Sequence, residues 1–306
     1  MTSSLDLPGI TVLERGWLSA NNLLLDDGEA AVLVDSGHCV HAAQTVALLE
    51  AALAGRPLRE LVNTHLHSDH CGGNAAVRRR WGMPVRVPAG PLPAVSAWDE
   101  DRLSYRPTGQ RCERFDADGA LDAGGTLVTG RRRWQVLAAP GHDPDSLMLF
   151  DPQDGVLISA DALWENGFGV VFPELDGERA FEDVARVLDL IASLPVRVVL
   201  PGHGAPFTDV AGALQRARRR LDGFVADPAR HARHALKVLV KYHLMEEGAQ
   251  DLAALHAWAA ATPLMRRVWG DLAPGRPIAD GLAEVLTDLV GSGALRQDGD
   301  GRVHDT

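Results

Sequence analysis

Residues 64–70, which read Thr-His-Leu-His-Ser-Asp-His, limit the fold and the chemistry of this chain more than any other feature. The segment follows directly on a β-rich run, so we expect it to begin where a strand ends. Alternate residues of an extended chain project to the same side, so His65 and His67 can hold one metal ion together. Asp69 and His70 lie where the chain turns and can face a second ion. The segment therefore predicts a metal centre at a strand end.

Three later segments supply matching ligand types, each just after a predicted strand: His142 in Pro-Gly-His-Asp, Asp161 in Ser-Ala-Asp-Ala and His203 in Pro-Gly-His-Gly. Alone, each residue is more often part of a turn, but with residues 64–70 they form a ligand set. Imidazole and carboxylate ligands suit Zn²⁺, and also Fe or Mn. Asp161 has no neighbouring histidine and best fits a carboxylate shared by two cations, which offsets their repulsion at roughly 3.5–4 Å. The set predicts two divalent metal ions, with Zn favoured.

The first two thirds of the chain alternate between β-rich runs and amphipathic helical patterns. The predicted strands cover residues 9–16, 22–25, 30–34, 58–63, 85–87, 134–138, 146–150, 156–159 and 196–200, and helical spacing of apolar residues occurs over residues 42–53 and 181–191. Strands and helices in this order predict a layered α/β architecture rather than an all-β sandwich. Such a scaffold favours active-site groups at the points where strands end and loops begin.

The pattern changes after about residue 212. Apolar residues recur at helical spacing within residues 232–244, 252–259 and 282–290, which predicts three amphipathic helices. Asp-Gly-Asp-Gly at residues 298–301, between β-compatible flanks, predicts a hairpin. We therefore expect a catalytic domain over residues 1–212 and a winged-helix-like C-terminal domain over residues 213–306.

Charge and cysteine content restrict the function further. The chain has 30 basic and 41 acidic residues, a formal net charge of −11, and a field of that sign discourages attraction to nucleic acid or anionic membrane. Its three cysteines lie far apart, which argues against a disulfide framework and for a reducing compartment. No apolar run approaches the roughly 18–20 residues of a membrane span, and the first residues lack a secretory signal. We expect a cytoplasmic protein with no membrane partner.

Three arginine runs, at residues 78–80, 131–133 and 216–220, are local exceptions to the acidic balance. Runs of this length usually form a solvated face. Three aromatic residues near the ligand segments, Trp98, Trp164 and Phe168, are candidates either for lining a substrate pocket or for ordinary packing.

The segment HLHSDH, with PGHD, SADA and PGHG downstream in that order, resembles the metallo-β-lactamase superfamily over about residues 9–210. The resemblance implies a four-layer αββα sandwich that is followed in the sequence by the winged-helix-like C-terminal appendage. It also implies a set of ligands, which places His65, His67 and His142 at one metal, Asp69, His70 and His203 at the other, and Asp161 between them. Asp35, in Val-Asp-Ser-Gly, matches a family aspartate at a strand end that supports the site from outside the ligand set; a simple turn residue is the alternative.

Details within the motifs favour some branches of this superfamily. Asp69 followed by His70, with an aspartate at position 161, resembles hydrolases such as glyoxalase II, lactonases and RNA nucleases. The lactamases with a cysteine ligand would need a cysteine near Asp161, and a flavodiiron oxygen reductase would have an acid in place of His67. The C-terminal pattern further resembles the winged-helix-like tail of the lactamase-like β2 subgroup, which includes an endoribonuclease.

We therefore expect a metal-dependent hydrolase that uses a metal-bridging hydroxide to cleave an ester or thioester bond of a small molecule. Asp69 is the predicted catalytic residue, because it would orient the hydroxide while binding one ion.

Two alternatives remain open. A phosphodiesterase or endoribonuclease of the lactamase-like β2 type would use the arginines at residues 131–133 or 216–220 as a phosphate track. A non-catalytic protein would bind nucleic acid or a partner and keep a vestigial metal site, but the filling of all seven ligand positions argues against it. The acidic stripe of Asp280, Glu284 and Asp288 also disfavours a DNA-recognition helix and favours a pocket wall or a homodimer surface.

Overall fold

The computed structural model describes residues 7–306 and divides by internal contacts into two compact units. The first unit comprises residues up to 103 together with 112–221, and the second comprises residues 104–111 together with 222–306. Helix α8 (Val210–Ala226) runs through residue 212 without a break, so the units divide later in the chain than the boundary expected from the sequence. The short segment 104–111 leaves the first unit, and the chain then returns to it.

The first unit contains a six-stranded sheet whose strands follow one another in chain order. Its strands are β1 (Ile10–Leu13), β2 (Asn22–Asp26), β3 (Ala31–Val34), β4 (Leu58–Val62), β5 (Val85–Pro88) and β6 (Gly119–Leu121). The β1–β2 and β2–β3 pairs are antiparallel, and the pairs from β3 to β6 are parallel. Strand β4 runs directly into the histidine segment, as the sequence predicts.

A second sheet of five strands has the order β11-β10-β9-β8-β7. Its strands are β7 (Thr126–Thr129), β8 (Arg132–Ala138), β9 (Leu147–Asp151), β10 (Val156–Ala160) and β11 (Val198–Pro201). Only the β10–β11 pair is parallel. Strands β9 and β10 are buried on both faces, whereas β8 alternates between buried and exposed residues.

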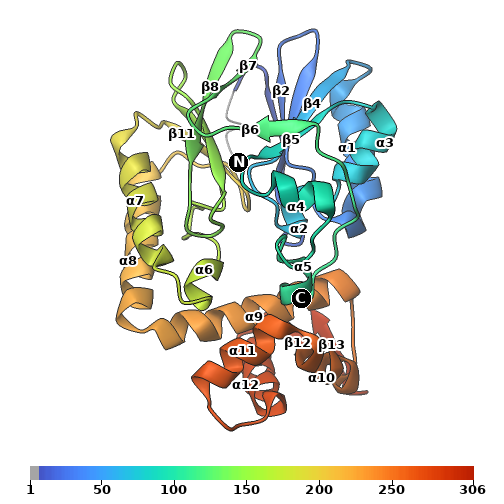
Figure 1. Cartoon of the computed structure of the whole chain (residues 1–306), viewed down its shortest axis with the longest axis vertical. Coiled ribbons are helices and arrows are strands. Elements are labelled where there is room, and N and C mark those ends of the chain that lie inside the picture. Colours follow the sequence, from blue (N-terminus) through green and yellow to red (C-terminus); the bar gives the residue numbers. More distant parts are fainter. Residues whose placement is uncertain (1–6) are drawn as a thin grey trace. The chain divides into compact units, whose positions relative to one another are not determined.

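The core lies between the two sheets. Its apolar side chains come from both, and include Leu25 and Val32 of the first sheet and Trp134, Leu149 and Ile158 of the second. Helices α1 (Ala42–Leu53) and α3 (Asn74–Trp81) lie beside the first sheet, and α7 (Ala180–Ser193) and α8 lie beside the second (Figure 1). This arrangement confirms the four-layer αββα sandwich. Short helices fill the connections: η1 (Cys39–His41), α2 (Ser68–Cys71), α4 (Leu92–Ala97) and α6 (Phe172–Leu175).

The second unit is mainly helical. It holds α5 (Tyr105–Thr108), α9 (Pro228–Glu247), α10 (Leu252–Ala261), α11 (Pro263–Leu272), α12 (Ile278–Gly291) and a hairpin of β12 (Leu295–Gln297) and β13 (Val303–Asp305). The sequence predicted three long helices and the hairpin, so α11 is an addition. It was missed because Pro263 starts a new helix directly after α10, where proline is favoured at the first helical position.

One arginine of the run at residues 131–133 does not lie on a solvated face. Strand β8 begins at Arg132, two residues before the predicted strand, and its alternation turns that side chain inward. The buried guanidinium pairs with Asp151 and, at 2.6 Å, with Asp154. For Arg132 the prediction of a solvated face is therefore wrong, because a buried arginine requires such partners.

Within residues 7–306, no helix combines the length and apolar character that crossing a membrane would need.

We expect Trp134→Ala to lower the free energy of unfolding by about 3–5 kcal/mol, because it opens a cavity between the two sheets. The indole is fully buried, and its Nε1 donates a 3.0 Å hydrogen bond to Thr129 Oγ1. Urea unfolding followed by circular dichroism measures the change. Val128→Ala is the control, since Val128 is 43% exposed on β7 and should alter stability by no more than about 0.5 kcal/mol. Equal losses in the two variants would contradict this description of the core.

Candidate metal centre

The structure brings together all seven ligand residues predicted from the sequence. They lie in the connections after four strands: residues 65–70 follow β4, with Asp69 and His70 in α2, His142 follows β8, Asp161 follows β10 and His203 follows β11. Six of the seven residues are buried, and the His67 side chain is only 11% exposed.

The seven side chains form two groups. The first group is His65, His67 and His142, and the second group is Asp69, His70, Asp161 and His203. In each group, one nitrogen or oxygen from every member lies within 4.8 Å of the others. His67 Nδ1 is 2.7 Å from His142 Nε2 in the first group, and His203 Nε2 is 3.0 Å from Asp69 Oδ2 in the second. The clusters are thus positioned for two metal ions.

Asp161 lies between the two groups. Its Oδ2 is 3.4 Å from His142 Nε2 of the first group and 3.8 Å from His203 Nε2 of the second. Its Oδ1 is 3.3 Å from His70 Nε2. The position would suit a carboxylate shared by two cations, and this role of Asp161 stays a prediction.

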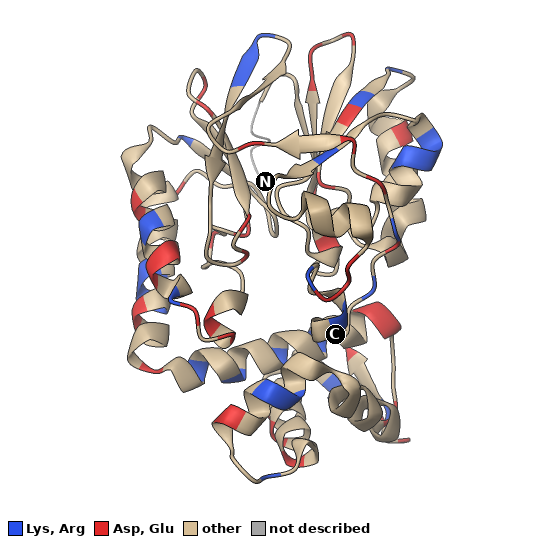
Figure 2. Cartoon of the chain, in the orientation of Figure 1, with Lys and Arg blue, Asp and Glu red and all other residues tan. Residues whose placement is uncertain are grey.

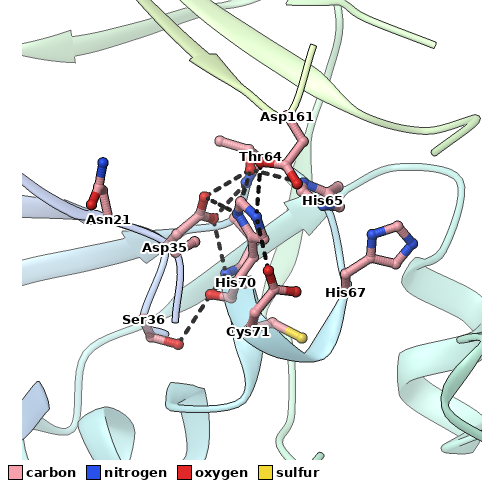
Figure 3. A network of polar contacts seen from close by, with 12 residues as sticks. Asn21, Asp35, Ser36, Thr64, His65, His67, His70, Cys71 and Asp161 are labelled. Atoms are coloured by element: carbon pink, nitrogen blue, oxygen red, sulfur yellow. Dashed lines mark hydrogen bonds and ion pairs between the residues drawn. The ribbon is translucent and has the colours of Figure 1, made fainter. Parts of the chain in front are cut away.

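Asp35 orients two of the histidines from outside the groups (Figure 3). Its Oδ2 accepts hydrogen bonds from His70 Nδ1 at 2.8 Å and from Thr64 Oγ1 at 2.7 Å, and its Oδ1 accepts one from the Thr64 backbone N–H at 2.9 Å. The Thr64 hydroxyl in turn accepts from His65 Nδ1 at 3.1 Å. Both rings therefore carry a proton on Nδ1, so Nε2 is the nitrogen that is available to a metal ion, which is the usual arrangement around metal-binding histidines.

His142 is oriented by a main-chain group. Its Nδ1 donates to the Val170 carbonyl oxygen at 2.5 Å, so Nε2 is left as the acceptor in the first group. The chain passes so close to this ring that only glycine fits at position 169, where a Cβ atom would lie 2.4 Å from His142 Nδ1. Gly169 is therefore a packing requirement of the site.

Two buried nitrogen atoms support the fit of metal ions to these residues. Among the described residues, His65 Nε2 and His70 Nε2 have no hydrogen-bond partner. An unsatisfied buried polar atom costs about 1–3 kcal/mol, and a metal ion that accepts its lone pair removes the cost. The residues present therefore fit divalent cations.

The backbone is strained beside two of these positions. Asp35 has φ 57° and Ala160, directly before Asp161, has φ 46°, a left-handed conformation that non-glycine residues seldom adopt. Strain of this kind costs about 1–3 kcal/mol per residue and is held only where the surroundings fix it. Here it directs the carboxylates of Asp35 and Asp161 toward the histidines.

The first group is electrically neutral near pH 7. Burial lowers the pKa of His67 to about 4, and burial together with the neighbouring His67 lowers that of His142 to about 4. Burial and then the neighbouring His70 hold the pKa of His65 well below its usual value. All three imidazoles are thus in the form that binds metal.

The second group carries charge. Burial alone would lower the pKa of His70, but the carboxylates of Asp161, Asp69 and Asp35 together raise it well above its usual value. Burial would raise the pKa of Asp69, yet His70 and His203 lower it to about 2. The Asp161 carboxyl is held well below its usual pKa in the same way, chiefly by His70. Two buried carboxylates demand positive charge, which the His70 proton supplies in the metal-free chain.

Sequence reasoning missed two residues at the site. The Trp17 ring stacks on His203 with centroids 5.3 Å apart and 13° between the planes. Asn21 holds the loop of His203 through its side chain, which donates to the carbonyl oxygens of Pro201 at 3.0 Å and Gly204 at 2.7 Å. Both residues lie in the connection between β1 and β2, which contains no ligand motif, so no sequence signal identified them.

The three aromatic candidates have different places. Trp164 borders the site, since its Nε1 donates to Asp161 Oδ1 at 3.2 Å. Phe168 is buried in the core, and Trp98 packs edge-on against Phe115 with ring centroids 5.6 Å apart.

The chain has two facing sheets with outer helices, and two groups of histidines and aspartates lie at the strand ends. This combination places it among the metallo-hydrolases. The chain belongs to the metallo-beta-lactamase superfamily, whose family model matches residues 15–203.

Two relatives and one solved structure illustrate the similarity. The chain is 29% identical over 199 residues to the probable metallo-hydrolase YqgX of Bacillus subtilis (strain 168). The matched residues make up 64% of this chain and 89% of that protein. The chain is 33% identical over 172 residues to a hydroxyacylglutathione hydrolase of Dechloromonas aromatica (strain RCB), covering 56% of this chain and 52% of that protein, so it spans about half the length of that relative. A metallo-beta-lactamase family protein from Thermus thermophilus shares the fold, with a TM-score of 0.57, 23% identity and coverage of 98% and 99% of the two chains. Membership of this family, together with the similarity to these hydrolases, identifies the chain as a metal-dependent hydrolase.

We expect Asp35→Asn to weaken metal binding by about 10–100-fold, because an amide has only one acceptor oxygen and its NH2 group would face either the donors to Oδ2 or the Thr64 backbone N–H at Oδ1. Titration of the metal-free protein with Zn²⁺ against a chromogenic chelator measures the affinity. Asp189→Asn is the control, since that carboxylate is exposed on α7 and pairs only at the surface with Arg218. Equal affinities in all three proteins would contradict the role of Asp35 in orienting the rings.

We expect metal loading of the second group to displace the proton of His70. Its pKa is raised in the metal-free chain, so at pH 7 the ring is protonated, and metal affinity should fall as the pH is lowered further below that pKa. Calorimetric titration with Zn²⁺ in two buffers of different ionisation enthalpy counts the released protons. His70→Gln should release about one proton fewer than the unchanged protein. The same count in both would show that His70 is neutral before loading.

Proposed function

We propose that the chain hydrolyses an ester or thioester bond of a small molecule at the two groups described above. The observation that carries the proposal is the Asp161 carboxylate, which lies within 3.4 Å of a histidine nitrogen in each group. His65, His67 and His142 would hold one divalent ion, Asp69, His70 and His203 the other, and Asp161 both. Zn is the favoured metal for this mixture of imidazole and carboxylate, with Fe and Mn as alternatives.

Two bound cations would supply an acidified water molecule and positive charge for the developing oxyanion. The chain's own residues prepare the site for this. Asp35 and Val170 fix the tautomers of the histidines, which leaves their Nε2 atoms directed into the groups. Asp69 is the proposed catalytic residue, since its ionised carboxylate belongs to the second group and could hold the attacking water by a hydrogen bond.

An acyl substrate is favoured over a phosphodiester because most arginines of the three runs already pair with carboxylates. Arg78, Arg79 and Arg80 pair with Asp118, Glu113 and Glu50, and Arg216 and Arg218 pair with Asp209 and Asp189. Arg132 is buried, so it cannot contact a nucleic acid. Basic and acidic residues are interspersed along α7 and α8 (Figure 2), and the net charge of −11 repels a polyanion. The similarity to a hydroxyacylglutathione hydrolase also supports a thioester substrate.

The proposal is tested by metal analysis and a substrate panel on the same purified protein. We expect about two metal ions per chain, and hydrolysis of thioesters or esters in preference to lactones, a phosphodiester and single-stranded RNA. His67→Ala should lower kcat/KM on the order of a hundredfold or more, because it removes a ligand, while the chain stays folded.

His256→Ala is the matched control, since that histidine is exposed on α10 of the second unit. It should keep full activity. Undiminished turnover by His67→Ala, or by metal-depleted protein, would refute the proposal, and cleavage of RNA alone would favour the nuclease alternative.

A further inference from the structure

An exposed tryptophan lies beside the second group. One face of the Trp17 indole stacks on His203, and yet the residue is 56% exposed. Single exposed apolar residues are common on protein surfaces and need no explanation. Trp17 differs from them because it touches a proposed metal ligand and because its loop is fixed.

Hydrogen bonds tie the Trp17 loop to the second group at two points. The Asn21 backbone N–H donates to Gly202 O at 2.7 Å, next to His203, and the Ala20 N–H donates to Asp69 O at 3.0 Å. The Asn21 side chain adds two bonds to the loop of His203. These bonds fix the end of the loop, and the stacking on His203 holds one face of the indole, which lowers the entropy that ligand binding costs.

Other aromatic rings continue this surface. Trp164 meets Trp17 edge-on, with centroids 5.5 Å apart, while its own Nε1 donates to Asp161. At the first group, Phe172 lies edge-on to His67 with centroids 5.2 Å apart. Aromatic side chains thus border both groups and can contact an apolar substrate on either side of the scissile bond.

We propose that the exposed face of Trp17 binds the acyl group of the substrate, and that this acyl group is an aryl ring or an alkyl chain of several carbons. The inference rests on the proposed hydrolysis of an ester or thioester. An apolar acyl group gains by leaving water against a flat, rigid indole, in proportion to the area covered. A short or strongly polar acyl group gains little there. Trp17 is therefore the residue that sets the preference among acyl groups.

A competing role for Trp17 is simply to support His203. The two roles predict different kinetics. If Trp17 only positions His203, its removal should change the metal affinity, or lower kcat by the same factor for every substrate. A binding surface acts through KM, and its effect grows with the apolar area of the acyl group.

The test compares the acetyl, butyryl, octanoyl and benzoyl thioesters of one thiol, with the metal-loaded protein. We expect kcat/KM to rise about 10–50-fold from acetyl to octanoyl in the unchanged chain, mostly through KM. In Trp17→Ala this ratio should fall to about one to threefold, and Trp17→Phe should keep an intermediate ratio. Trp81→Ala, which removes a partly exposed indole at the end of α3, should leave the ratio unchanged.

Binding of the product acids provides a readout that does not depend on turnover. Octanoate should bind metal-loaded Trp17→Ala about tenfold more weakly than the unchanged chain in a calorimetric titration, with equal metal content in both proteins. An equal loss for acetyl and octanoyl substrates, or reduced metal content in Trp17→Ala, would overturn the inference and make Trp17 a support for His203. No thioester turnover at all, together with octanoate binding that needs Trp17, would instead overturn the proposed function and leave the binding surface in place.

Discussion

The hydrogen bonds that Asp35 accepts are the interactions on which the metal centre depends. One buried carboxylate fixes His70 directly and His65 through the Thr64 hydroxyl, so a single side chain sets the direction of two lone pairs. Asp35 reaches them only because its backbone adopts a φ of 57° at the end of β3. That conformation is unfavourable by itself, and the hydrogen bonds to the carboxylate offset it. A metal centre built in this way requires β3 and β4 to be paired, since Asp35 and Thr64 follow these neighbouring strands.

The two groups differ in charge, and the difference has a chemical consequence. The first group offers three neutral imidazoles, whereas the second includes the ionised Asp69 and, shared with the first, Asp161. Neutral ligands leave a cation with most of its charge, and carboxylates neutralise part of it. In the proposed hydrolysis, a cation in the first group would therefore be the better one to polarise a carbonyl oxygen, and a cation in the second group would be the better one to hold an attacking water. Trp17 stands on the side of the second group, through its contact with His203.

The sequence predicted the ligands well because each occupies a short motif at a strand end, and a strand end is recognisable from local residue patterns. What it could not supply was contact between segments that are remote in the chain. Trp17 has no motif of its own, and its loop is brought to His203 by the hydrogen bonds of Asn21 and by the stacking of the indole on the His203 ring. Arg132 was misplaced because the predicted strand started two residues late, and period-two alternation decides which side chain faces inward. Helix α11 was missed for a local reason, the proline that separates it from α10.

The glycine before His203 shows how closely the loops approach one another. A Cβ atom at position 202 would lie 2.2 Å from Asp161 Oδ1 and 3.0 Å from His70 Cε1, so any other residue would push the Asp161 carboxylate away. Gly202 has no left-handed φ, so conformational freedom does not explain it. Its backbone also accepts the N–H of Asn21, the residue that anchors the Trp17 loop. The same glycine therefore admits Asp161 between the groups and fixes the connection that carries Trp17, which couples the geometry of the metal centre to the surface proposed to select the acyl group.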